Sequence, residues 1–189
     1  LQFIPCLDPL EAERGSYPFS LLPEDYGKFL CTLFDAWYDD WKAGHYVSVR
    51  LFDDYVHLLL GLPAGTCATT GRCGTCFISE GDGGLYPCDF FVLDEWRLGS
   101  VNDGRTLGQI ASCERERRFL SESAAKPEEC ASCRWRSLCN GGCKRDWYRA
   151  DGKNHNYYCP AFRTFFAYAE ERLMQIAAAE RSAMRGGAF

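Results

Sequence analysis

Cysteine is the residue type in this sequence with the greatest capacity for chemistry, because it occurs twelve times among 189 residues. Small secreted scaffolds held together by disulfides contain still more, about 8–10%. No basic and apolar leader opens the sequence, so we expect reduced thiols in a cytoplasmic protein rather than disulfides. Thiolates bind zinc and iron–sulfur clusters, and the spacing of the cysteines therefore indicates metal chemistry.

The tightest group of cysteines lies in the segment CASCRWRSLCNGGC. It spaces Cys130, Cys133, Cys139 and Cys143 as Cys-x2-Cys-x5-Cys-x3-Cys. Two thiolates separated by two residues can bind one metal from a single turn, and the glycine pair before Cys143 lets the last two thiols point in different directions. Structural zinc and an iron–sulfur cluster both remain open on this pattern.

A second group of cysteines lies in CATTGRCGTCFISEGDGGLYPC. Residues 76–88 predict a β-hairpin, because two short apolar stretches flank a glycine-rich turn. The hairpin would return the chain, so that Cys67 and Cys73 come back towards Cys88.

The order of these cysteines resembles the seven-cysteine signature of SPASM domains, the auxiliary-cluster domains of radical S-adenosylmethionine enzymes. The matching positions are Cys73-x9-Gly83-x4-Cys88, then Cys130-x2-Cys133-x5-Cys139-x3-Cys143, then Cys159. The segments LYPCDFFVLDEWRLGSV and NYYCPAFRTFFAYAEERL, and Cys67 six residues before Cys73, are similar to the anaerobic sulfatase-maturating enzymes of that superfamily. The resemblance covers essentially the whole chain and implies that LQFIPCLDPL is the last strand of a partial (β/α) barrel.

The resemblance implies two [4Fe–4S] clusters with four cysteine ligands each. The first would take Cys67, Cys73, Cys88 and Cys143, and the second Cys130, Cys133, Cys139 and Cys159. Four thiolates leave no iron of a cluster open, so both clusters would carry electrons rather than bind substrate. Of the other cysteines, Cys31 falls on an apolar helix face, and Cys76 is close enough in sequence to compete as a ligand.

Asp89 is the candidate catalytic residue, because it follows Cys88 within an otherwise apolar stretch. If it were buried there, desolvation would raise its pKa towards the range of a general base. A turn aspartate bonded to backbone amides, or a partner of Arg97 or Lys144, is the alternative. The resemblance implies that Asp89 takes the proton from the thiol or hydroxyl of the substrate.

The function implied by the resemblance is oxidation of a Cys or Ser in a sulfatase to Cα-formylglycine. S-adenosylmethionine and a third [4Fe–4S] cluster would lie in a missing N-terminal part, since this sequence has no Cys-x3-Cys-x2-Cys motif, and the chain alone would be inactive. The partners would be the sulfatase polypeptide and an electron donor such as flavodoxin or ferredoxin. Two alternatives remain: a SPASM enzyme that forms thioether or carbon–carbon links in peptides, and a structural zinc-binding interaction module.

Composition argues against two other kinds of partner. The net charge is −5 and the basic residues form no block, which disfavours nucleic acid. No apolar run approaches the ~20 residues of a membrane-spanning helix. We therefore predict neither a nucleic-acid nor a membrane partner.

Apolar spacing predicts the elements that must position the cysteines. We expect an amphipathic helix over residues 23–43, a strand over 46–52 and a short helix that ends at Gly61. A helix over 106–123 should turn Leu107, Ile110 and Phe119 inward and charged residues 114–118 outward, and a helix over 160–185 should precede a frayed tail.

These elements predict an α+β fold. We expect three parts: the barrel end with its linker helices over residues 1–63, a cysteine-rich SPASM domain of hairpins and helices over 64–159, and a C-terminal helix with its tail over 160–189.

Overall fold

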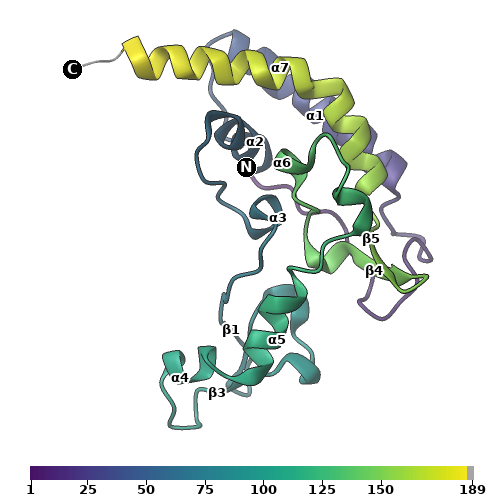
Figure 1. Ribbon diagram of the computed structural model, residues 1–189, viewed down its shortest axis with the longest axis vertical. Coiled ribbons are helices and arrows are strands. Elements are labelled where there is room, and N and C mark those ends of the chain that lie inside the picture. Colours follow the sequence, from purple (N-terminus) through teal and green to yellow (C-terminus); the bar gives the residue numbers. More distant parts are fainter. Residues whose placement is uncertain (187–189) are drawn as a thin grey trace.

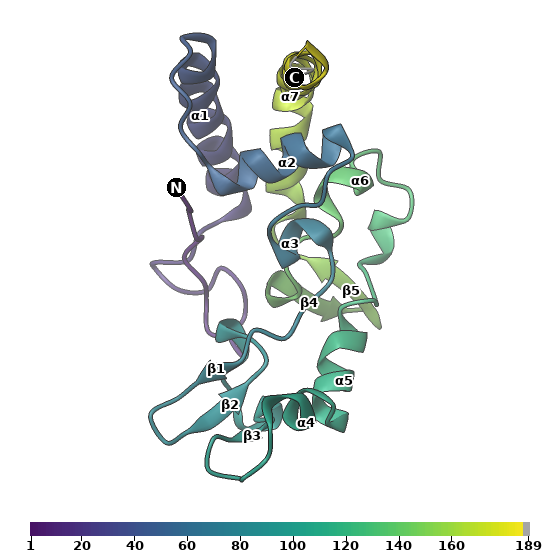
Figure 2. The same cartoon turned by 90° about the vertical axis from the view of Figure 1, so that its left-hand side faces the viewer.

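The computed structural model describes residues 1–186 and combines helices with two small antiparallel sheets, as the α+β prediction requires. The long helices gather at one end of the molecule and a hairpin sheet lies at the other (Figures 1 and 2). The last three residues of the predicted frayed tail lie outside the described residues. Residues 1–9 form no strand, although Arg50 donates a backbone hydrogen bond to Leu1, so the barrel strand stays a prediction.

Three helices form the helical end. They are α1 (Pro23–Lys42), α2 (Arg50–Leu60) and α7 (Cys159–Gly186). The predicted helix at 23–43 is confirmed, with Pro23 in its first turn. The strand predicted at 46–52 is wrong: α2 begins at Arg50, because Phe52, Tyr55 and Val56 bury one helical face, and it ends at a left-handed Gly61 with φ 78°.

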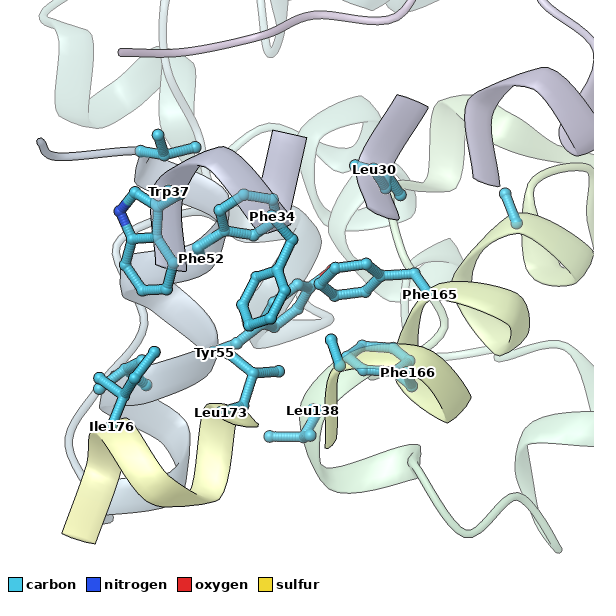
Figure 3. Close-up of a cluster of buried hydrophobic side chains, with 14 of the residues drawn as sticks. Leu30, Phe34, Trp37, Phe52, Tyr55, Leu138, Phe165, Phe166, Leu173 and Ile176 are labelled. Carbon is cyan, nitrogen blue, oxygen red and sulfur yellow. The ribbon is translucent and has the colours of Figure 1, made fainter. Parts of the chain in front are cut away.

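Aromatic rings from these three helices build the main core (Figure 3). The ring of Phe165 on α7 lies 5.6 Å from that of Phe34 on α1 and 5.5 Å from that of Phe52 on α2, measured between centroids. Such edge and stacked pairs add to the free energy of burying the rings. The core therefore fixes the start of α7, where Cys159 stands, and it also packs against Cys139.

The opposite end is built around the predicted hairpin, which the structure confirms with shorter strands. The strands β1 (Ile78–Ser79), β2 (Gly84–Tyr86) and β3 (Gly99–Ser100) form an antiparallel sheet in that order. Two small cores support this end, one around Leu85 and one around Phe119.

The helix predicted over 106–123 is divided in two. Helix α4 (Leu107–Ala111) ends before Cys113, whose Sγ accepts a hydrogen bond from the Glu116 amide at 3.4 Å and so caps α5 (Glu114–Glu122). Because a new helix begins at Glu114, a different set of side chains points inward than one continuous helix would bury. Leu107 is exposed, and Glu116 is fully buried and accepts a hydrogen bond from the Thr75 hydroxyl. The prediction of an outward charge run is therefore wrong at Glu116.

Short elements connect the two ends, and two of the helices carry Cys67 and Cys139. These elements are α3 (Cys67–Thr70), α6 (Arg136–Cys139) and the hairpin of β4 (Trp147–Ala150) with β5 (Lys153–Asn156). Single 3₁₀ turns occupy Asp89–Phe91, Asp94–Trp96, Glu128–Cys130 and Lys144–Asp146. None of the helices within residues 1–186 has the length and apolarity needed to cross a membrane.

Candidate metal centre

The first group of thiols is assembled from segments that lie far apart in the sequence. Cys67 begins α3, which buried Asp54 of α2 holds in place: the carboxylate accepts hydrogen bonds from the Gly65 amide at 2.6 Å and the Thr66 hydroxyl at 2.7 Å. The amide of Cys73 donates to the Ser123 hydroxyl at 3.1 Å. The loop that leads to Cys67 is thereby attached to α2, and the loop that carries Cys73 is attached to the end of α5.

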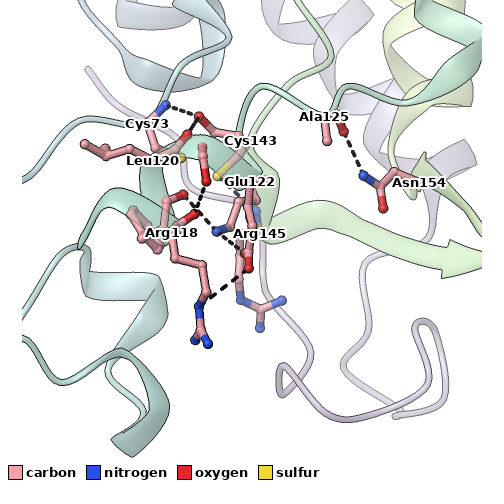
Figure 4. Close-up of polar contacts among 12 residues, drawn as sticks. Cys73, Arg118, Leu120, Glu122, Ala125, Cys143, Arg145 and Asn154 are labelled. Atoms are coloured by element: carbon pink, nitrogen blue, oxygen red, sulfur yellow. Dashed lines mark hydrogen bonds and ion pairs between the residues drawn. The ribbon is translucent and has the colours of Figure 1, made fainter. Parts of the chain in front are cut away.

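One cavity is lined by three of these thiols: those of Cys67, Cys73 and Cys143. Cys88 lies at the edge of this group, near enough to Cys67 that, after burial and Asp89, the Cys67 thiol adds to the rise in the pKa of Cys88. Burial raises the pKa of Cys88 to about 12. Cys143, which comes from the other cysteine segment, lies near Cys73 (Figure 4), and both line the cavity with Cys67.

The second group lines a single cavity with all four of its thiols, from Cys130, Cys133, Cys139 and Cys159. Cys130 ends a 3₁₀ turn, Cys139 ends α6 and Cys159 begins α7, so the main core orients this group. Burial raises the pKa of Cys139 to about 12, and the neighbouring thiols of Cys130 and Cys159 add to the shift. Free thiols with raised pKa values are protonated at neutral pH, so metal binding would release protons.

The turn between Cys139 and Cys143 sends these two thiols to different cavities. Asn140, Gly141 and Gly142 all have positive φ angles, of 49°, 86° and 66°. The Asn140 side chain donates to the carbonyl of Thr69 at 2.7 Å, which ties the turn to α3. Three successive left-handed residues reverse the backbone in a way that few other sequences allow.

We expect Gly142→Ala to destabilise the protein more than Gly152→Ala. Both residues have positive φ angles, 66° and 76°, so each alanine carries a strain of about 1–2 kcal/mol. A Cβ at Gly142 would also lie 2.6 Å from the Asn156 Nδ2, whereas a Cβ at Gly152 meets nothing within 4 Å. Urea unfolding followed by circular dichroism measures the difference, and equal losses in the two variants would contradict it.

The remaining cysteines have separate roles. Cys31 packs against the main core, as predicted, and Cys113 caps α5. Cys6 is exposed. Cys76 is exposed as well. Burial is the main cause of the raised pKa of Cys67, and the nearby Cys76 thiol adds to it. Cys76 is thus a fifth thiol near the four of the first group, and substituting it gives a control for substitutions of the proposed ligands.

Asp89 stands beside the first group, but the burial expected for it is wrong in this structure. Its side chain is exposed, and Oδ1 accepts hydrogen bonds from the Phe90 amide at 3.1 Å and from the Cys88 thiol at 3.3 Å. The other suggested partners are engaged elsewhere: Arg97 pairs with Asp82 and Lys144 with Glu122. Asp89 lies next to a thiol, and no salt bridge within residues 1–186 involves it.

A larger pocket joins the two groups of thiols. Cys67, Cys139 and Cys143 line it together with Phe90 and the N-terminal residues 2–5 and 7. It also contains Asp146, which sequence reasoning missed; burial raises the pKa of this carboxyl to about 6. Its position three residues after Cys143 was the only signal in the sequence.

Lysine side chains accompany the thiols: Lys126 was not singled out in the sequence, and Lys144 was considered only as a partner of Asp89. The Lys144 ammonium lies 4.1 Å from the centroid of the Phe119 ring and 2.9 Å from the Glu122 carboxylate. Lys126 and Lys144 both line the cavity of the first group, and Arg163 lines that of the second. Basic groups offset the negative charge that four thiolates bring to one site.

The donor set suits an iron–sulfur cluster better than any oxygen-binding metal, since every convergent ligand is a thiol. Within residues 1–186, no three Cys, His, Asp or Glu side chains are arranged to hold a single metal ion. The fit to a four-iron cluster thus rests on two observations: each group has four thiols, and these thiols surround a cavity in the second group and, except for Cys88, in the first.

Comparison with known proteins gives the family context. The model of the SPASM iron–sulfur cluster-binding domain matches residues 67–134. A cysteine-type anaerobic sulfatase-maturating enzyme of Clostridium perfringens is 44% identical over 179 residues, which are 94% of this chain and 48% of that enzyme. A serine-type enzyme of Bacteroides thetaiotaomicron is 32% identical over 163 residues, 84% of this chain and 39% of its own length.

A solved structure described as native anSMEcpe with bound AdoMet and Kp18Cys peptide superimposes with a TM-score of 0.88 at 43% identity. The match covers 94% of this chain and 49% of that structure. The chain thus spans about half the length of the cysteine-type relatives and solved structures that it matches.

The chain therefore contains an iron–sulfur cluster-binding domain of the SPASM class. It is a relative of the anaerobic sulfatase-maturating enzymes of the radical S-adenosylmethionine superfamily, and the resemblance drawn from its cysteines is confirmed.

Proposed function

We propose that this chain is the auxiliary-cluster part of an enzyme that oxidises a cysteine or serine of a sulfatase to Cα-formylglycine. The observation that carries the proposal is the grouping of the cysteines at two sites: four line one cavity, and Cys67, Cys73 and Cys143 line another with Cys88 nearby. Similarity over 94% of the chain to anaerobic sulfatase-maturating enzymes supports it. Residues 64–159 would form the cluster domain, and the chain would act with a part that binds S-adenosylmethionine.

Cys67, Cys73, Cys88 and Cys143 would hold one [4Fe–4S] cluster, and Cys130, Cys133, Cys139 and Cys159 the other. When bound, the clusters would supply a site for the electron that the substrate gives up. The chain's own residues would limit the access of water to the clusters and hold charge beside them, since all these cysteines except Cys67 are partly buried and lysines line the first cavity.

Asp89 would act as the general base. A carboxylate can take the proton of a substrate thiol or hydroxyl when it stands within hydrogen-bonding reach of it. The hydrogen bond from the Phe90 amide holds Oδ1 beside the first site, whereas the bond from the Cys88 thiol would be lost once that sulfur binds iron as a thiolate. The exposure of Asp89 supports this role, because a substrate peptide can reach an exposed carboxylate.

A cysteine is the favoured target. Identity to the cysteine-type relatives from two Clostridium species is 44% and 40%, against 32% for the serine-type enzyme of Bacteroides thetaiotaomicron. The pocket between the two groups of thiols, whose lining is mainly apolar but includes Arg50 and Asp146, is where we place the peptide. Flavodoxin or ferredoxin would supply electrons to the enzyme.

The experiment that tests the proposal is a metal analysis of the protein prepared without oxygen. We expect about eight irons per chain with matching acid-labile sulfide, or about four if one cluster is lost in handling. About two zincs per chain without sulfide would contradict the proposal and indicate a structural zinc module. Iron, sulfide and zinc are measured on the same sample, so that the three values can be compared directly.

A further inference from the structure

Lys126 lies between the two groups of thiols. On one side it lines the cavity of Cys67, Cys73 and Cys143. On the other side its Cδ lies 3.3 Å from the position that a Cβ at Gly141 would take, and the Cys130 Sγ lies 3.7 Å from that same point. One side chain therefore lines the first cavity and, with its alkyl part, approaches Gly141 and Cys130 at the second.

Thiols of both groups affect the pKa of the Lys126 ammonium. Burial lowers the pKa of Lys126, while Cys73 of the first group and Cys130 and Cys139 of the second raise it. Across residues 1–186, no carboxylate lies within the 4.0 Å of a salt bridge to it. Within the described residues Lys126 is thus paired with no acidic side chain, and ionised thiols of both groups would stabilise its charge.

The position of Lys126 is fixed by the local fold. Its ammonium donates a hydrogen bond to the carbonyl of Gly71, the left-handed residue that ends α3. The ammonium also lies 5.2 Å from the centroid of the Trp147 ring. The following residue, Pro127, is fully buried and restricts the backbone.

We propose that Lys126 is a shared electrostatic partner of both cluster sites and raises the reduction potential of each. Reduction adds an electron to a cluster, so a nearby fixed cation stabilises the reduced state more than the oxidised one. The effect is strong where water is excluded. The inference rests on the proposed function, because it requires a cluster at both sites.

Lys144 provides a contrast within the same molecule. It lines the cavity of the first group alone, and its charge is shared with Glu122 at 2.9 Å. Lys144 acts on the pKa of Cys73, lowering it against the effect of burial. A role at one site only is therefore expected for Lys144.

The test compares three variants of the iron-loaded protein in redox titrations followed by electron paramagnetic resonance. Lys126→Met should shift both midpoint potentials to more negative values. Lys144→Met should shift only the potential of the first cluster, and Lys153→Met, at an exposed lysine paired with Glu128, should shift neither. Cys143→Ala and Cys130→Ala, each lacking one cluster, assign the signals.

Unmoved potentials in Lys126→Met with full iron content would overturn the inference and leave the proposed function standing. A shift of only one cluster would overturn the shared role. If Lys126→Met loses iron, Lys126→Arg decides: iron and normal potentials in the arginine variant support a required charge, and iron loss there indicates a steric role and overturns the inference. Zinc in place of iron in the unmodified protein would overturn both proposals.

Discussion

Replacing Cys143 with alanine should remove about four of the roughly eight irons from the loaded protein and leave the other four in place. The thiol of Cys143 lies with Cys67 and Cys73, although its neighbours in sequence serve the other cavity. A cluster with three thiolates and an open iron is exposed to water and oxidant. Iron and sulfide per chain, measured without oxygen, give the result.

Double variants decide which thiols share a cluster. Cys143→Ala with Cys73→Ala should lose no more iron than either single variant, whereas Cys143→Ala with Cys130→Ala should lose nearly all of it. Cys76→Ala is the matched control, because Cys76 is an exposed thiol beside Cys67 that has no assigned ligand role. Iron loss in that control, or additive loss in the first double variant, would contradict the assignment.

Asp89→Asn should reduce kcat by about 10²- to 10⁴-fold in a protein that also carries the S-adenosylmethionine-binding part, since this is the range of general-base contributions. Asparagine keeps the shape and can still accept the Phe90 amide hydrogen bond, but it cannot take up a proton at neutral pH. Both clusters should still load, because Asp89 is not among the proposed ligands. Turnover of a sulfatase peptide to formylglycine is followed by mass spectrometry.

Asp94→Asn is the control for this prediction. Asp94 is also an exposed aspartate at the start of a 3₁₀ turn, five residues further along the chain. Its substitution should leave turnover and iron content unchanged. Normal turnover in Asp89→Asn, with full iron content, would remove Asp89 from the role of base.

The sequence predicted the elements whose periodicity is long and regular. Helix α1 and the long α7 were found within a few residues of their predicted bounds, because a buried aromatic stripe sets the helical face. Residues 46–52 were misread as a strand, since four alternating residues before Arg50 resemble one while the face of α2 is set by distant packing. At residues 106–123 a cysteine cap interrupts the helix, which periodicity cannot reveal.

The sequence was enough to propose which cysteines belong to each group. It was not enough to predict where the charged side chains around them lie. Cysteine spacing gave the two groups, including the crossing of Cys143, only through a known family pattern. The exposure of Asp89, the burial of Asp146 and the place of Lys126 between the groups depend on which loops meet in space. Such contacts join segments that are distant in sequence, and no local pattern marks them.

The crossing of Cys143 also has a consequence for damage by oxygen. The first group closes a long stretch of chain that contains the whole hairpin end, which has only two small cores of its own. The second group closes a much shorter stretch beside the main core. Opening a longer loop restores more conformational entropy to the chain. Destruction of the first cluster would therefore increase the flexibility of the whole hairpin end, whereas destruction of the second would affect only a short segment beside the main core. Loss of the first cluster to oxygen would thus expose the hairpin end to proteases.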